Sequence, residues 1–191
     1  MKITIVHRVG AFLAIVAAAL LAACAADSSV SPNRGRLTPA TRDASESVAL
    51  GVCQKLNVTD AELAFHAYAS GVQIYRWTGS SWALVGPSAQ LFADAGNNAK
   101  VGTHYVGPTW ESKSGSKVVG AVIDRCTPEP NAIPWLLLGA VSSDGAGVFN
   151  GVTRIQRLNT VGGLAPATPG AVVGDVVSIP YSAEYFFYRP E

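Results

Sequence analysis

From about residue 48 onward, apolar and polar residues alternate in short runs that are separated by turn residues. The segment AELAFHAYA places Phe65 and Ala67 on one face and His66 on the other, and GVQIYRW continues this alternation. A period of two residues is typical of a strand that buries one face. The sequence therefore predicts strands across these two segments.

The rest of the chain has the same character. SKSGSKVVGAVID predicts a hairpin that turns at Ser114 and Gly115, because serine and glycine interrupt two β-prone runs. AIPWLLLGAV is a continuous apolar run that is too short to span a bilayer, and it predicts a strand buried on both faces. The chain finishes with AVVGDVVSIPYSAEYFFYR, whose β-branched and aromatic residues favour strands.

Glycine and proline are spread among all these runs and leave no room for a long amphipathic helix. Many short strands separated by turns predict an all-β fold, either an antiparallel β-sandwich or a barrel. One short helix is expected over PSAQLFADAG, where Ser88 could cap it and Gly96 could end it. We interpret residues 48–191 as a single β domain, since this length suits one hydrophobic core.

The first residues have a different character. Lys2 and Arg8 flank the start of an apolar run of about a dozen residues, which is typical of a signal-peptide core. The sequence Leu-Ala-Ala-Cys24 follows and resembles the lipobox of bacterial lipoproteins, in which the cysteine is acylated and the chain is cut before it. Residues 1–23 are therefore predicted to be a lipoprotein signal peptide. An ordinary secretory signal cut at a nearby alanine is the alternative, and both interpretations export the protein.

The residues after Cys24 predict where the protein is attached. Residue 25 is alanine rather than aspartate, which by resemblance to lipoproteins of Gram-negative bacteria favours the outer membrane, facing the periplasm. Several acyl chains on one N-terminus, such as palmitate, would keep a protein stably attached to a membrane. Residues 24–47 are rich in Ser, Ala, Thr and Pro and nearly lack large apolar groups, so we expect a flexible tether.

Charge argues against a nucleic-acid partner. Of the 14 Lys and Arg residues, two leave with the signal peptide, and the rest stand against 13 Asp and Glu residues. Binding to nucleic acid would require a basic surface, which this nearly neutral chain does not provide. The partners expected instead are the membrane, through the lipid anchor, and a small ligand.

Cysteine usage predicts one internal cross-link. Cys53 and Cys126 remain once Cys24 is acylated, and an even number of cysteines in an oxidising compartment favours a disulfide. A pair of buried free thiols is the alternative. Neither cysteine belongs to a Cys-x-x-Cys or Cys/His cluster, so a metal role is not expected.

The stretch GTHYVGPTWES concentrates candidate binding chemistry. It carries His104, Tyr105, Trp110 and Glu111 around a Gly-Pro corner. Because glycine and proline would bend the chain, these four side chains could converge on one concavity, and aromatic faces beside polar groups suit a sugar ring or another small ligand. The alternative is a packed bend in which Trp110 and Tyr105 fill the core and His104 satisfies a backbone carbonyl.

An envelope hydrolase is the alternative function. His104 is the strongest base candidate, because His7 leaves with the signal peptide and His66 lies on an alternating strand. Glu111 or Asp124 would have to orient it, and Trp110 beside Glu111 would raise the pKa of that carboxyl by desolvation. No Gly-x-Ser-x-Gly elbow is present, so a non-enzymatic module is the leading hypothesis and no catalytic residue is assigned.

The sequence predicts neither a metal nor an organic cofactor. His66 and His104 have no short spacing of the kind that metal sites use. The glycines of DGAGVFNG are spaced one residue too widely for a dinucleotide-binding loop, and the surrounding residues predict a hairpin rather than a strand-to-helix turn.

Five ordered motifs remain: GVQIYR, GTHYVGPTWES followed by GSKVVG, AIPWLLLGA, VTRIQRLNTVGGLAP and IPYSAEYFFY. In this order they resemble the domain of unknown function 3455, a family of exported bacterial proteins with fungal relatives. The likeness covers about residues 60–190. It implies a single secreted or lipid-anchored domain with no established activity or cofactor. Residues and resemblance together predict an envelope lipoprotein that binds a small molecule or a glycan, or has a structural role.

Overall fold

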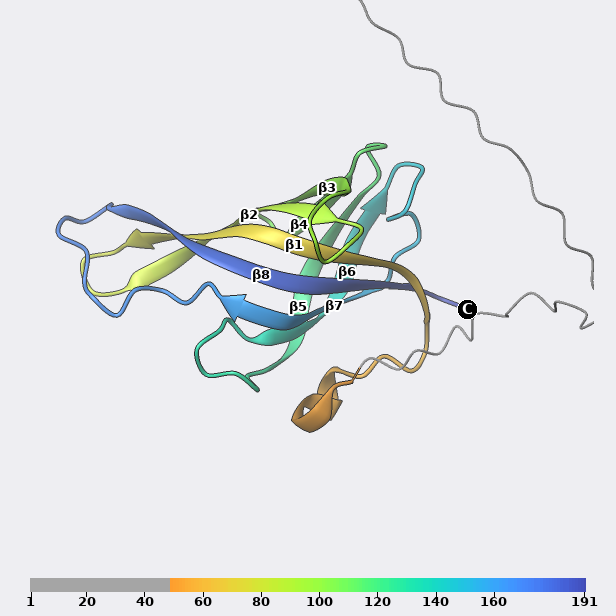
Figure 1. The fold of residues 1–191 in the computed structure, drawn as a ribbon, viewed down its shortest axis with the longest axis horizontal. Helices are drawn as coiled ribbons and strands as arrows, with labels where there is room; N and C mark the ends of the chain where they lie inside the picture. Colours follow the sequence, from red (N-terminus) through yellow and green to blue (C-terminus); the bar gives the residue numbers. More distant parts are fainter. Residues whose placement is uncertain (1–48) are drawn as a thin grey trace, which may run out of the picture. The chain divides into compact units, whose positions relative to one another are not determined.

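The computed structural model describes residues 49–191, which form eight strands preceded by a short 3-10 helix (Figure 1). The elements in chain order are the 3-10 helix η1 Gly51–Leu56 and the strands β1 Glu62–Trp77, β2 Trp82–Phe92, β3 Lys100–Tyr105, β4 Thr109–Ser112, β5 Lys117–Cys126, β6 Trp135–Asp144, β7 Arg154–Gly162 and β8 Val176–Arg189. The predicted signal peptide, the tether and Cys24 lie outside the described residues.

The strands close into a barrel. Each strand pairs antiparallel with the next, and β8 returns to pair with β1 from Glu62 opposite Arg189 to Arg76 opposite Val176. The long yellow β1 and blue β8 run side by side in Figure 1. Closure leaves no free sheet edge, which would otherwise template pairing with another chain. The predicted all-β antiparallel fold is confirmed, and of the two expected architectures it is the barrel.

Alternation along the strands fills the barrel with side chains. At one end the rings of Phe65, Phe149 and Phe187 pack together, with centroids between 4.7 and 6.0 Å apart. Trp110 and Tyr185 continue this cluster toward the middle, and each lies within 6.3 Å of Phe187. These rings fill part of the interior, and Trp110 and Tyr185 stand at the boundary with the remaining open space.

The helix expected over PSAQLFADAG is wrong. Ser88 lies within β2, where it pairs with Val72 on one side and Tyr105 on the other. The run alternates, with Ala89 and Leu91 buried and Gln90 exposed, and two neighbouring strands supply its backbone partners. Tertiary pairing therefore overrides the local capping signal.

The one helical segment of the described chain is η1, which the sequence did not indicate. It packs beside the barrel through the predicted disulfide between Cys53 and Cys126, whose Cα atoms are 5.7 Å apart, so this pairing is confirmed. The Gln156 side chain also donates a hydrogen bond of 2.6 Å to the Leu56 carbonyl. Within the described residues, no helix has the length and apolarity needed to cross a membrane.

Candidate functional site

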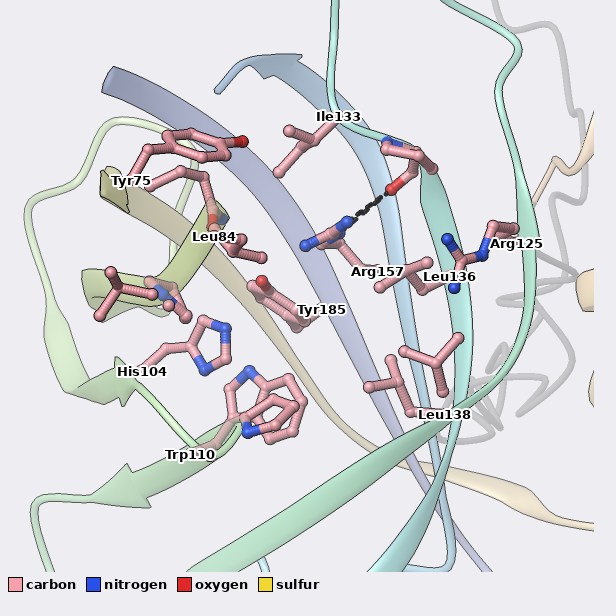
Figure 2. A pocket seen from close by; sticks show the side chains of 18 residues that line it. Tyr75, Leu84, His104, Trp110, Arg125, Ile133, Leu136, Leu138, Arg157 and Tyr185 are labelled. Carbon is pink, nitrogen blue, oxygen red and sulfur yellow. Dashed lines mark hydrogen bonds between the residues drawn. The ribbon is translucent and has the colours of Figure 1, made fainter. Parts of the chain in front are cut away.

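A cavity of about 350 Å³ opens into the part of the barrel that the phenylalanines leave free. Its lining comes from the end of β1, the start of β2, the β3–β4 turn, the end of β5 and the segment before β6. The cavity therefore lies at the barrel end that carries these connections. Deeper inside, its walls include Tyr75, His104, Trp110, Arg157 and Tyr185, as seen in Figure 2.

The entrance of the cavity is apolar. Leu84, Val85 and Val122 line it, and they remain between 42% and 58% exposed. Leu136 and Leu138 continue this apolar surface inward from β6. Exposed aliphatic residues around a concavity are typical of a site that receives an apolar molecule.

His104 lies on the wall of the cavity and is only 2% exposed. Its ring Nδ1 donates a hydrogen bond of 2.9 Å to the Thr109 carbonyl, so in the neutral ring Nε2 carries the lone pair. Burial lowers the pKa of His104 to about 3, and the nearby Arg157 charge acts in the same direction. At neutral pH the ring is therefore uncharged.

Trp110 stacks on His104 and is 1% exposed. Tyr185 meets both rings edge-on, at centroid distances of 5.0 Å and 5.3 Å. Gly120 beneath the indole makes this packing possible, because a β-carbon there would lie 3.1 Å from the Trp110 ring. The indole face that a sugar ring would use is thus occupied by the protein's own side chains.

Three buried polar atoms of residues that line the cavity have no hydrogen-bond partner among the described residues: Gln73 Nε2, Trp110 Nε1 and the Tyr185 hydroxyl. Buried polar groups in folded proteins are nearly always paired, so orphaned donors beside a cavity point to a ligand atom or a solvent molecule as partner. Burial raises the pKa of Tyr185, against a smaller opposite effect of the Arg157 charge. Its hydroxyl therefore stays protonated and can donate.

Arg157 brings a positive charge into the cavity. Its guanidinium donates through Nε and Nη2 to the Pro134 carbonyl, at 3.2 and 2.8 Å. Figure 2 shows this group extending toward Tyr185, with Arg125 farther out. The cavity lining contains these two arginines and no aspartate or glutamate.

Tyr105 and Glu111 do not share this cavity with His104 and Trp110. In the β3–β4 hairpin His104 lies opposite Trp110, so both point inward, whereas Tyr105 and Glu111 lie on the alternate face. There the Tyr105 hydroxyl donates to Glu111 at 2.6 Å, and Lys117 lies 3.4 Å from the same carboxylate. The Tyr105 hydrogen bond, with the Lys117 charge, lowers the pKa of Glu111 despite its neighbour Trp110, so the expected rise is wrong.

Neither carboxylate proposed for a hydrolase contacts His104. Asp124 pairs with Lys55 at 2.7 Å, an interaction that lowers its pKa, and Glu111 is engaged by Tyr105. A histidine–carboxylate pair does exist elsewhere, where His66 Nε2 lies 2.9 Å from Glu184. A catalytic triad would require a carboxylate hydrogen-bonded to His104, the histidine that lines the open cavity. The described residues do not form this arrangement.

Sequence reasoning missed Arg157, Tyr185 and Tyr75. A usable signal was present for Arg157, because it lies two residues after Ile155 and so faces the same side of β7 as that fully buried side chain. An arginine on an apolar face marks a place where a charge enters the interior. Within residues 49–191, no group of three or more His, Cys, Asp or Glu side chains could hold a metal ion.

The fold and the cavity define a class: closed antiparallel barrels whose interior is partly filled by side chains and partly open as a cavity. A family model described as a protein of unknown function (DUF3455) matches residues 58–189. The chain therefore belongs to the DUF3455 family, as the ordered motifs indicated. Neither the curated proteins nor the solved structures contain a significant match.

Proposed function

We propose that this protein is a non-enzymatic binding module of the bacterial cell envelope that takes a small, largely apolar molecule into its barrel cavity. The observation that carries the proposal is the open cavity itself, with an aliphatic entrance and unpaired buried donors on its inner wall. Ligand sites in proteins typically combine apolar walls with a few placed polar groups.

A small molecule fits this cavity better than a glycan. Sugar rings are held by an exposed aromatic face with many hydrogen-bonding groups around it. Here the Trp110 face is covered by His104, and most of the lining is aliphatic or aromatic. The neutral, carboxylate-free environment of His104 likewise gives no support to the hydrolase alternative.

The envelope location belongs to the same proposal. Acylation at Cys24 would attach the chain to the outer membrane, and residues 24–47 would lift the barrel off the lipid surface. The disulfide between Cys53 and Cys126 agrees with an oxidising compartment. A binding module in this position would meet apolar molecules that partition between membrane and periplasm.

Binding of the neutral apolar probe N-phenyl-1-naphthylamine tests the proposal, through the rise in probe fluorescence on transfer from water. We expect saturable binding that weakens about fivefold or more in Val122→Trp, because an indole at the entrance takes up space that the probe needs. Ile123→Trp is the matched control, since Ile123 is exposed and does not line the cavity. The absence of saturable binding, or equal loss in both variants, would contradict the proposal.

A further inference from the structure

The lining of the cavity contains positive charge and no carboxylate. Arg157 and Arg125 both line it, no acidic residue does, and neither arginine forms an ion pair within residues 49–191. Lys55, Lys117 and Arg154 each pair with a carboxylate, and, apart from the two arginines of the lining, the remaining cations of the described residues lie outside this cavity. A partly buried charge without a counter-ion is costly, so its presence in a cavity calls for an anionic partner.

Arg157 is held in position and keeps donors free. Its two hydrogen bonds both go to one neutral acceptor, the Pro134 carbonyl, which fixes the guanidinium plane. A guanidinium has five N–H donors in a fixed fork, of which Nε and Nη2 reach Pro134, while the group also acts on the Tyr185 hydroxyl at the cavity wall. The remaining N–H groups can therefore donate to a planar anion without reorganisation of the side chain.

The groups around Arg157 also favour an anion in the cavity. Trp110 Nε1 and Gln73 Nε2 are donors without a partner among the described residues. The protonated Tyr185 hydroxyl lies on the same cavity lining, within the influence of Arg157. The positive charge of Arg157 acts on Tyr75, His104, Tyr181 and Tyr185, and it opposes the burial effect on the three tyrosine pKa values. The wall thus offers several donors around one cation.

We infer that the ligand is a monocarboxylate with an apolar body, whose carboxylate binds Arg157 while the body fills the space between Leu138 and the entrance. This inference rests on the proposed function. A carboxylate suits the planar fork of arginine, and the aliphatic remainder of the lining gives a bare inorganic anion nothing to fill. Arg125 at the outer part of the cavity adds attraction during entry.

The competing explanation is that Arg157 only anchors the segment before β6 through Pro134. A structural anchor and a ligand anchor respond differently to a matched pair of ligands. Naphthalene-2-carboxylate and 2-naphthylmethanol have the same ring and nearly the same size, but only the first is charged. If Arg157 only anchors the segment before β6, its loss would weaken the binding of both compounds. If Arg157 binds the anion, its loss would weaken the binding of the acid alone.

Isothermal titration calorimetry of both compounds with the full, disulfide-bonded protein tests the inference. We expect the acid to bind about tenfold or more tightly than the alcohol, because charge-assisted hydrogen bonds are roughly twice as strong as neutral ones. Arg157→Gln should remove this preference, with the alcohol affinity unchanged within about twofold, and Arg157→Lys should retain part of it. Arg125→Gln should weaken the acid alone, by a smaller factor that added salt diminishes.

Equal affinity of the two compounds for the wild-type protein would overturn the inference and leave the proposed function standing. Binding of neither compound would overturn both. If Arg157→Gln fails to fold, as judged by circular dichroism, Arg125→Gln decides: an unchanged acid-to-alcohol ratio in that variant would also count against the inference. Retention of the full preference in a folded Arg157→Gln variant would show that Arg157 is not the anchor.

Discussion

The imidazole of His104 lies flat against the indole of Trp110, with ring centroids 4.4 Å apart and planes that differ by 7°. The two residues are directly opposite in the β3–β4 hairpin, so backbone pairing brings the rings together. Both rings are buried, yet both line the cavity. The hairpin is therefore part of the core and part of the cavity wall at the same time.

Acidification should destabilise the protein through His104. Burial lowers its pKa in the folded state to about 3, below the ordinary value of 6.5, so the unfolded chain binds the proton more readily. The stability that the neutral ring contributes is fully present above pH 6.5 and is lost as the pH falls toward 3, at about 1.4 kcal/mol per pH unit. Urea denaturation should detect a loss of about 2 kcal/mol from this residue between pH 7.5 and 5.

His104→Asn is the matched control for this effect. Asparagine can donate to the Thr109 carbonyl but does not titrate, so its pH dependence reports all the other groups. The difference between the two proteins isolates His104 from exposed carboxylates such as Asp124 and Glu111. Parallel pH profiles for wild type and variant would mean that His104 is not kept neutral by burial.

Gly120→Val should destabilise the barrel by about 1–3 kcal/mol, the usual cost of overpacking a core. A β-carbon at this position would lie 3.1 Å from the Trp110 ring and 3.3 Å from Leu138. Ala121→Val, on the exposed face of the same strand, should change the free energy of unfolding by less than about 0.5 kcal/mol. Guanidinium denaturation of both variants measures the contrast, and equal effects would show that the space under Trp110 is not restricted.

Removal of the disulfide should cost about 4 kcal/mol of stability, since it closes a loop with a sequence separation of 73 residues. The double substitution of Cys53 and Cys126 by serine, compared with the oxidised wild type in urea, gives this number. Wild type with a reducing agent is the second reference. A loss below about 1 kcal/mol would imply that η1 stays in place without the cross-link.

Cys24→Ser should move the protein from the membrane fraction to the soluble envelope fraction, because the substituted residue cannot carry the diacylglycerol thioether. Immunoblots of fractionated cells measure this. Substitution of Ser28 by alanine, four residues farther along the chain, provides a control that leaves the lipobox intact. Membrane attachment of Cys24→Ser at the wild-type level would refute the lipid anchor.

Much of the fold could be predicted from the sequence, because period-two alternation is a local signal that survives in each strand. Barrel closure could not, since the pairing of β1 with β8 joins residues such as Tyr68 and Glu184 that are far apart in the chain. The helix expected over Ser88 is wrong because the neighbouring strands β1 and β3 supply hydrogen bonds to this segment that its own capping signal does not reveal.

The site was predicted in part. The aromatic hairpin drew attention to His104 and Trp110, which do line the cavity, but the expected bend placed Tyr105 and Glu111 with them. Once the stretch is a hairpin, the alternation rule separates the two pairs onto opposite faces. Arg157 comes from β7, and only the closed barrel places it across from the hairpin.

The indole ¹H–¹⁵N resonance of Trp110 tests the central claim most directly. Its Nε1 is buried at the cavity wall without a partner among residues 49–191, whereas Trp82 Nε1 donates to the Thr168 carbonyl in an exposed position and Trp82 does not line the cavity. On titration with N-phenyl-1-naphthylamine, the account predicts a saturable shift of the Trp110 signal while the Trp82 signal stays in place. An unchanged Trp110 signal at saturating probe, or a shift confined to Trp82, would contradict a ligand site inside the barrel.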